Sequence, residues 1–331
     1  MRILVTGSAG HLGEALVRAL DETGHEVVGL DVLASEFTRV VGSIADRDCV
    51  QGAMAGVDAV IHSATLHKPH VGSHGRGDFV DTNITGTVNL LELAVEAGVS
   101  RFLFTSTTST FGRALTPAPE DPAAWVTEDV APLPRNIYGV TKTAAENLCE
   151  LVWRDHRLPC LILRTSRFFP EADDHPASRD AYPDLNLKVN ELLYRRVDIQ
   201  DAVDAHLLAL QRAPDIGFGR YIISATTPFG RDDLAELRRD TPAVVRRLYP
   251  DFEEIYAMRG WTMLGSIDRV YVNARAREEL GWSPAYDFRR ALDAVAAGQD
   301  PRSPLTHTIG AKGYHAEPTG VYTTRSRGTA R

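Results

Sequence analysis

The first half of the chain alternates short apolar runs with longer segments of helical periodicity. Apolar runs occur at residues 3–5, 27–30, 59–62, 102–104 and 160–163, and none alternates strictly with polar residues. Helical spacing marks residues 11–23, 85–97 and 138–155. Strands that are apolar on both sides and are separated by helices are typical of a parallel sheet covered on both faces. The pattern therefore predicts an α/β protein with a doubly wound parallel sheet.

The pattern changes after Arg164. Residues 168–186 are rich in Pro, Asp and Phe and are expected to form a loop. Helices are predicted at 198–211, 230–240 and 286–297, and a strand at 221–223. We expect a first domain over 1–165, a smaller α+β lobe over 166–300 with some segments returning to the main sheet, and an irregular tail over 301–331 whose last dozen residues are disordered.

The amino-acid composition limits which partners the protein can bind and which cellular compartment it can occupy. The chain has 331 residues with 36 Lys and Arg against 44 Asp and Glu, a net charge of −8. This acidic balance argues against nucleic acid as the main partner, and no apolar run approaches the roughly 20 residues that span a bilayer. The three cysteines, Cys49, Cys149 and Cys160, form no CxxC pair. With no signal peptide at the start, we expect a cytoplasmic protein without a cysteine zinc site.

The turn between the first predicted strand and helix carries three glycines. Gly7 permits a tight turn, Gly10 lets a pyrophosphate approach the backbone, and Gly13 lets helix and strand pack closely. The first helical residues, His11 and Leu12, offer free N–H groups at the positive end of the helix dipole. The strand–turn–helix context predicts a dinucleotide-binding site.

Asp31 predicts which dinucleotide is bound. It ends the second strand, 18 residues after Gly13, where a carboxylate accepts hydrogen bonds from a ribose 2′-hydroxyl and repels a 2′-phosphate. The residues that follow it, 32–34, offer no cation. The predicted cofactor is NAD. The alternative is NADP, for which Arg39 would pair with the 2′-phosphate.

A proton-transfer constellation follows the fourth strand. Hydroxyl residues fill positions 105–110, and Tyr138 and Lys142 stand four apart at the start of a long helix, so they share one face. A nearby ammonium favours the phenolate and is expected to lower the pKa of Tyr138 toward working pH. Tyr138 can then exchange a proton with a substrate hydroxyl held by Thr107, while hydride moves to or from a nicotinamide.

Together these motifs resemble the extended short-chain dehydrogenases/reductases of the NAD-dependent epimerase/dehydratase family, which have a Rossmann-type domain. The resemblance rests on residues 6–13, 57–64, 83–87, 106–112, 138–142 and 280–284. It implies that Tyr138 is the catalytic base, Lys142 the ligand of the nicotinamide ribose and Thr107 the catalytic hydroxyl. It also places cofactor contacts at Ser63, Ala64, Asn83, Ser43 and Ile44, and Asn83 resembles the family asparagine that steadies the central helix. Ser43 replaces a family aspartate, so the adenine contact is expected to differ.

Departures from the family pattern bear on the substrate. The family's 4,6-dehydratases carry Thr-Asp-Glu where this chain has residues 107–109 without a carboxylate, so dehydration is not expected and Thr108 is a candidate substrate contact. Where members that use nucleotide sugars place a diphosphate-binding arginine, this chain has Tyr194, followed by Arg195 and Arg196. These two arginines are candidate substrate ligands or surface charges.

Two other positions are candidate substrate contacts. Arg167 is a candidate anion anchor, or else it pairs with the acidic residues at 171, 173 and 174. His67 and Lys68 follow the 59–62 strand. They are expected to contact an acidic or polyhydroxy substrate. The alternative is that they are ordinary polar residues of a surface loop. No metal is predicted, because this histidine-rich loop lacks a carboxylate partner. His62, inside the strand, is expected to be structural.

The resemblance implies an NAD-dependent enzyme that oxidises a secondary alcohol of a sugar or nucleotide sugar. An epimerase would keep its NAD, whereas a dehydrogenase would release NADH, and the residues leave both open. An NAD-sensing regulator is a third alternative, which the intact Tyr138 and Lys142 disfavour. Apolar residues on more than one face of 85–97 and 138–155 predict a homodimer, unless loops cover these helices.

Overall fold

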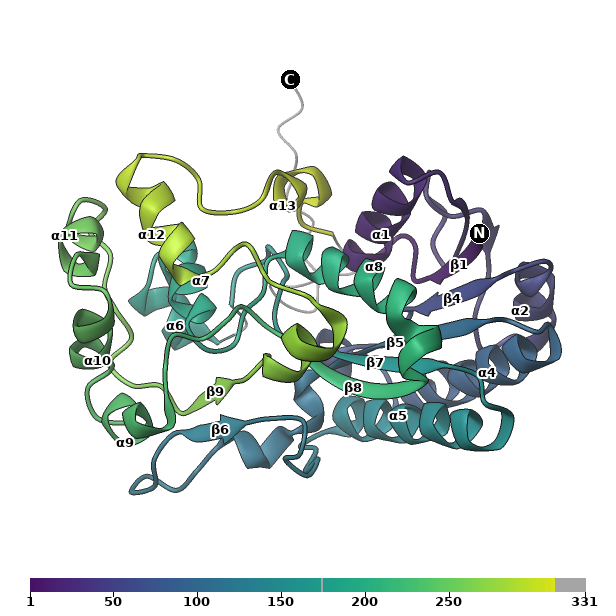
Figure 1. Cartoon of the computed structure of the whole chain (residues 1–331), viewed down its shortest axis with the longest axis horizontal. Helices are drawn as coiled ribbons and strands as arrows, with labels where there is room; N and C mark the ends of the chain where they lie inside the picture. Colours follow the sequence, from purple (N-terminus) through teal and green to yellow (C-terminus); the bar gives the residue numbers. More distant parts are fainter. Residues whose placement is uncertain (174, 313–331) are drawn as a thin grey trace.

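A computed structural model describes residues 1–173 and 175–312. Its main body is a seven-stranded, all-parallel sheet with strand order β3-β2-β1-β4-β5-β7-β8 (Figure 1). The strands are β1 (Arg2–Thr6), β2 (Glu26–Asp31), β3 (Val40–Val41), β4 (Ala59–His62), β5 (Arg101–Thr107), β7 (Cys160–Thr165) and β8 (Phe218–Ile223). The predicted doubly wound parallel sheet is confirmed.

Helices cover both faces of this sheet. One face packs on α2 (Arg47–Met54), α4 (Gly86–Glu96) and α5 (Ile137–His156), and the opposite face on α1 (His11–Glu22), α8 (Ile199–Ile216) and α13 (Pro304–Ile309). Within β1, Leu4 faces the first layer, while Ile3 and Val5 face the second. Both faces are therefore buried, which explains why the strands are apolar without alternation.

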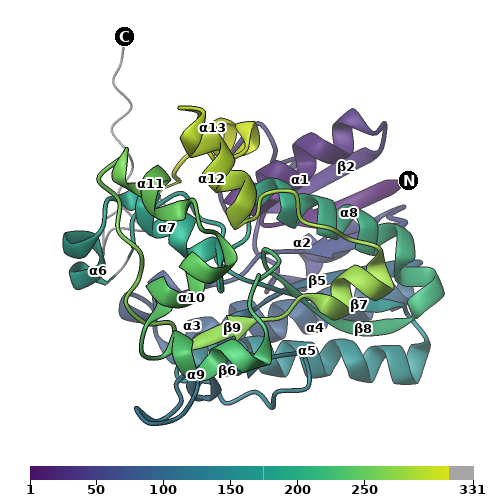
Figure 2. The same cartoon turned by 60° about the vertical axis from the view of Figure 1, so that its left-hand side comes forward.

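A smaller lobe stands at one end of the sheet, on the left in Figure 1, and comes forward in Figure 2. It has its own apolar core around Leu193, Leu237, Val244 and Leu292. Its elements are α6 (Pro176–Ala181), α7 (Asp184–Leu192), α9 (Leu234–Leu237), α10 (Thr241–Leu248), α11 (Phe252–Ala257), α12 (Phe288–Ala296) and the parallel pair β6 (Ala124–Val126) and β9 (Arg269–Tyr271).

The chain crosses between the two bodies more than once. β6 precedes residue 165 yet pairs in the small lobe, and β8 follows residue 165 yet extends the main sheet. Two predicted irregular segments contain helices: α6 and the start of α7 lie within 168–186, and α13 lies within 301–331. Both α6 and α13 start at a proline, a residue that favours the first helical position. The predicted disordered end lies outside the described residues.

A helical segment that contains one π-helical turn connects the loop after β4 to α4. It begins as α3 (Arg76–Val80), continues as one π-helical turn over Asp81–Thr85 and passes directly into α4. Such turns are frequent at functional sites. Along the described ranges, no helix has both the length and the apolar character needed to cross a membrane.

Candidate active site

A cavity of about 580 Å³ runs along the carboxyl ends of the central strands and extends to the small lobe. Doubly wound sheets bind ligands at this edge, at the point where the strand order reverses. In this sheet the reversal occurs at β1, which lies between β2 and β4. Most of the predicted site residues line this one cavity: Gly7, Gly10, His11, Leu12, Gly13, Asp31, Ser43, Ile44, Ser63, Ala64, His67, Lys68, Thr107, Thr108, Tyr138, Arg167 and Arg195.

The glycine turn has no room for side chains. Gly7 has φ +74°, a left-handed conformation that suits glycine, and its N–H donates to the Leu30 carbonyl at 2.8 Å. A Cβ atom on Gly13 would lie 1.8 Å from the Gly7 carbonyl oxygen. The first turn of α1 therefore presents bare backbone to the cavity, and this cradle fits the pyrophosphate of a dinucleotide.

Asp31 fixes the backbone at the end of the cleft where the adenosine is expected to bind. Its two carboxylate oxygens accept hydrogen bonds from the backbone N–H groups of Ala9, at 3.0 Å, and Leu33, at 2.9 Å. The carboxylate still borders the cavity, where it can accept from ribose hydroxyls. Arg39, which would pair with a 2′-phosphate, instead lies 3.1 Å from Glu26 and is not among the described lining residues. The geometry favours NAD over NADP.

Asn83 positions the cavity wall instead of lining it. It lies in the π-helical turn, and its amide nitrogen donates to the Leu66 carbonyl at 2.9 Å and to the Thr141 hydroxyl at 3.0 Å. Its amide oxygen accepts from the Leu66 N–H at 2.8 Å. Asn83 therefore joins the loop after β4 to α5, and its contact with the cofactor stays a prediction.

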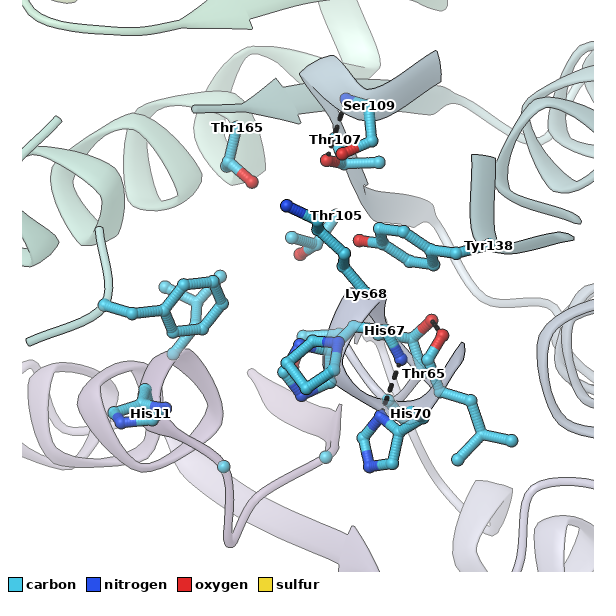
Figure 3. Close-up of a pocket in the computed structure, with 18 of the residues that line it drawn as sticks. His11, Thr65, His67, Lys68, His70, Thr105, Thr107, Ser109, Tyr138 and Thr165 are labelled. Carbon is cyan, nitrogen blue, oxygen red and sulfur yellow. Dashed lines mark hydrogen bonds between the residues drawn. The ribbon is translucent and has the colours of Figure 1, made fainter. Parts of the chain in front are cut away.

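The predicted proton-transfer residues come together at the ends of β5 and α5. The side chain of Asn136 accepts the Gly139 N–H at 3.0 Å and so fixes the start of α5. The Tyr138 hydroxyl points into the cavity near Thr107 (Figure 3), and the Thr107 side chain interacts with it in a way that lowers the Tyr138 pKa. One turn further, the Lys142 ammonium donates to the Thr105 carbonyl at 2.7 Å.

Burial dominates the acid–base properties of this pair. It raises the pKa of Tyr138 to about 12, and the interaction with Thr107 only partly opposes this rise. The predicted lowering of the Tyr138 pKa by Lys142 is therefore wrong for the protein groups alone. Burial also lowers the pKa of Lys142 to about 7, against the opposing charge of Glu146. Lys142 is directed at the Thr105 carbonyl and the face of Phe104, 3.9 Å from its ring centre.

Glu146 supports this pair and was not anticipated from the sequence. It lies one turn after Lys142 and is buried. The Ser106 hydroxyl donates to it at 2.5 Å, and the Arg164 guanidinium at 2.7 Å. Ser106 directly precedes Thr107, so a single carboxylate joins the helix that carries Tyr138 to the strand that carries Thr107. The only signal for it was its spacing of four from Lys142.

The three candidate arginines gather around the buried Glu191. Arg195 lies 2.7 Å and Arg196 2.8 Å from its carboxylate, while Arg167 lies 2.5 Å from Asp173. Burial would raise the pKa of Glu191, but the three guanidinium groups outweigh it and lower this pKa to about 2. None of the three is a free surface charge. Arg196 lines a separate small cavity and not the main one, and its role as a substrate ligand stays a prediction.

Arg269 is a further arginine that the sequence did not indicate. It comes from β9 and lines the main cavity together with Arg195 and Tyr271. The Nε atoms of Arg195 and Arg269 are both buried and find no hydrogen-bond partner among the described residues. These two donors could bind an anion. Only the long-range pairing of β6 with β9 brings Arg269 to the site.

The loop after β4 brings one lysine and two histidines toward the reaction centre. It forms a short 3-10 helix over Lys68–Gly72, and the His67 N–H donates to the His70 ring at 2.9 Å. Lys68 extends toward the space between Tyr138 and Thr165 (Figure 3). His62 is structural, bonded to Thr6 at 2.8 Å and Thr87 at 3.0 Å. Over the described ranges, no three His, Cys, Asp or Glu side chains gather as a metal site.

The few lysines of the chain are concentrated near the two cavities. The chain contains four lysines among its 36 basic residues. Lys68 and Lys312 line the main cavity, Lys142 follows Tyr138, and Lys188 lines the small cavity beside Phe168. Lys312 and its neighbour Glu171 were not predicted as site residues, although both border the cavity.

The doubly wound sheet, the glycine cradle and the Thr107–Tyr138–Lys142 arrangement define an extended short-chain dehydrogenase/reductase. Residues 3–223 match the model of the NAD dependent epimerase/dehydratase family, and the chain belongs to that family. The cradle and Asp31 fit the NAD that this family uses.

Several proteins are similar to this chain over most of its length. The low-salt glycan biosynthesis protein Agl12 of Haloferax volcanii is 29% identical over 89% of this chain and 97% of its own. A UDP-glucose 4-epimerase of Streptomyces lividans is 27% identical over 86% and 92%. A short-chain dehydrogenase/reductase superfamily protein from Agrobacterium tumefaciens, solved with bound NAD, superposes with TM-score 0.64 at 26% identity over 90% and 96% of the two chains.

Proposed function

We propose that the protein is an epimerase that inverts a secondary alcohol carbon of a nucleotide sugar and keeps its NAD between turnovers. The observation that carries this proposal is the convergence of Tyr138, Thr107 and Lys142 on the cavity that also holds the glycine cradle. The similarity to a UDP-glucose 4-epimerase over 92% of that protein supports epimerisation over simple oxidation.

In the proposed reaction Tyr138 moves the proton. In this proposal its phenolic oxygen takes the proton of the substrate hydroxyl and later returns one to the same oxygen, which the Thr107 hydroxyl holds in place. NAD, when bound, supplies the acceptor and donor of hydride. Because burial raises the Tyr138 pKa to about 12, the phenolate needs a nearby positive charge. Lys142, with a pKa near 7, supplies that charge when protonated.

Arg195 and Arg269 are the proposed ligands of the substrate diphosphate. Their side chains are mostly buried, line the same part of the wall and retain buried Nε donors without protein partners in the described chain. A diphosphate offers several oxygens to such donors, and guanidinium groups bind phosphate in a directed, charge-assisted way. In this proposal Arg195, next to Tyr194, and Arg269, from β9, take the place of the family arginine that would stand at position 194.

Elimination of water is not part of the proposal. Such a reaction needs an acid and a base next to the reacting carbons, but Thr108 and Ser109 follow Thr107. Carboxylates in the described lining are Asp31 and Glu171, and both contact the cofactor cradle.

The test combines cofactor content with turnover. The protein is purified without added nucleotide and denatured, and released NAD(H) is quantified by chromatography. UDP-sugars are then assayed for inversion by NMR and for NADH by absorbance, with Tyr138→Phe as the control. We expect about one NAD per chain and an inverted product without net NADH. Stoichiometric NADH without an inverted product would replace the epimerase by a dehydrogenase.

The diphosphate subsite has its own test. Arg195→Lys keeps the charge but loses the planar fork, and we expect KM for the nucleotide sugar to rise about tenfold or more at nearly unchanged kcat. The matched control is Arg196→Lys, a change beside the same Glu191 outside the main cavity. An equal KM effect in the control would assign the loss to the glutamate cluster instead of the substrate.

We also propose a homodimer through α5. Val140 and Leu151 lie three helical turns apart on this helix, and each is about half exposed, at 49% and 51%. Apolar side chains at such spacing form one exposed stripe beside α4, which α5 contacts.

A further inference from the structure

The first residue of α1 is fastened by its side chain to the loop after β7. His11 is buried, packs edge-on against Phe169 with ring centres 5.3 Å apart, and brings Nε2 within 2.8 Å of the Glu171 carboxylate. Glu171 is also buried. The backbone N–H of His11 belongs to the helix terminus that faces the cofactor cradle. Glu171 is thus one side chain away from the proposed phosphate-binding groups.

The same carboxylate also holds the far end of the chain. Oxygen Oε1 of Glu171 accepts the Lys312 backbone N–H at 3.0 Å. The Lys312 ammonium contacts Glu14, three residues after His11 on α1. Lys312 is therefore attached twice, once to the β7 loop and once to the first turn of α1, and it lines the main cavity.

The segment that carries Lys312 is anchored on its other side. α13 packs on α1 and α8 (Figure 1), and Ile309 joins the core beneath them. The Ser303 N–H and the Thr306 hydroxyl donate to Asp198 at 3.1 and 3.2 Å. Gly310, with φ +60°, ends α13 and turns the chain toward the cavity. Residues 310–312 therefore lie between two fixed points.

We propose that Glu171 is a cofactor-positioning residue: with His11 and Lys312 it fastens residues 310–312 beside the α1 end of the dinucleotide cleft and so slows the release of NAD. The inference rests on the proposed function, because an epimerase must keep its cofactor through both transfers. Lys312 adds positive charge close to the α1 terminus, where phosphates are favoured. Undoing its two attachments is then part of the route by which NAD leaves.

The experiment measures NAD release instead of activity. Protein loaded with NAD is mixed with excess ADP-ribose as competitor, and free NAD is quantified over time. We expect Glu171→Gln and Lys312→Ala each to release NAD about tenfold faster than the wild type, since each loses a charge-assisted contact. Arg289→Ala is the matched control. It loses ion pairs with Asp251 and Asp293 on α12 and should release NAD at the wild-type rate.

The double variant tests whether the two residues act through one segment. If both hold residues 310–312, the second change adds little, so the double variant releases NAD about as fast as the faster single variant. Multiplied effects, or single variants that release NAD as slowly as the wild type, would overturn the inference. Nucleotide-sugar turnover is assayed in parallel. Absent turnover with the expected release rates would contradict the proposed function alone.

Discussion

At the scale of single residues, burial decides the chemistry of Tyr138 and Lys142 more than their mutual spacing does. The spacing of four places both on one face of α5, which the sequence alone indicates. The directions of their pKa shifts follow from the surroundings, because Phe104 and the β5 backbone enclose Lys142. Burial shifts both groups toward their neutral forms, so we expect bound substrate and cofactor to change their ionisation.

Tyr138→Phe should abolish proton transfer without disturbing the fold. The ring remains packed, and only the hydroxyl that meets Thr107 is lost. We expect kcat to fall about 10²- to 10⁴-fold, the usual contribution of a positioned acid–base group. The affinity for NAD, measured by calorimetry, should stay unchanged. Retained turnover in this variant would contradict the role of Tyr138.

Lys142→Met should stabilise the protein at neutral pH while inactivating it. The folded-state pKa of Lys142 is about 7, against 10.5 in the unfolded chain, so folding below pH 7 requires burial of a charge. The variant should gain about 1 kcal/mol or more in urea unfolding, because one pKa unit corresponds to about 1.4 kcal/mol. The lost bond to the Thr105 carbonyl offsets part of this gain.

The stability difference between Lys142→Met and the wild type should depend on pH. Between pH 7 and 10.5 the unfolded wild type binds more protons than the folded form, so wild-type stability rises with pH across this window. The advantage of Lys142→Met should therefore be largest below pH 7 and shrink toward pH 10.5. An advantage that is independent of pH would show that Lys142 is not buried with a lowered pKa.

At the scale of elements, the contact between β1 and α1 depends on the absence of a side chain at Gly13. A methyl group there would lie 1.8 Å from the Gly7 carbonyl oxygen. Gly13→Ala should therefore lower the free energy of unfolding by about 1–3 kcal/mol, the range for an overpacked site, and weaken NAD binding. Denaturant unfolding with and without NAD measures both effects.

Gly52→Ala is the matched control for this change. Gly52 lies in α2, and no atom lies within 4 Å of an added Cβ. Alanine there should raise the free energy of unfolding by about 0.5–1 kcal/mol, since it restricts the unfolded chain and favours the helix. Equal effects at positions 13 and 52 would show that close packing at the cradle does not matter.

Local patterns predicted the elements that depend on nearby residues. The periodicity at residues 11–23 predicted α1, and the apolar run at 160–163 predicted β7. β6 and β9 have three residues each and are separated by the 142 residues from 127 to 268, so no local turn indicates their pairing. Arg269 and Lys312 reach the site only through such distant contacts. The polar, proline-containing sequences of α6 and α13 concealed their helices.

At the scale of the whole molecule, basic side chains gather at the cavity of an acidic chain. The net charge is −8, yet the described lining carries six Lys and Arg (Lys68, Arg135, Arg167, Arg195, Arg269 and Lys312) and the carboxylates of Asp31 and Glu171. Four of these cations have carboxylate partners behind the wall: Arg167 with Asp173, Arg195 with Glu191, Arg269 with Asp268 and Lys312 with Glu14. The wall therefore offers donors to an anionic cofactor while much of its charge is balanced, and the attraction that remains weakens as ionic strength rises.

Substitutions on the exposed face of α5 test the proposed homodimer. Val140→Glu combined with Leu151→Glu places two charges on the apolar stripe of α5 and should shift the protein to a monomer in light scattering. Met258→Glu changes an apolar residue that is 60% exposed beyond α11 and should leave the mass unchanged. A monomeric wild type would contradict the proposal directly.

The placement of the four lysines also determines how the protein tolerates amine chemistry. Reagents that acylate or cross-link amines ordinarily react over a whole protein surface, but here Lys68 and Lys312 line the main cavity, Lys142 is buried next to Tyr138, and Lys188 lines the separate small cavity. Apart from the N-terminal amine, such reagents meet arginine on the exterior, which they leave intact. Dyes, resins and fixatives that react with lysine side chains would thus modify the cavity residues Lys68 and Lys312, and attachment through Cys49 or a terminus would spare them.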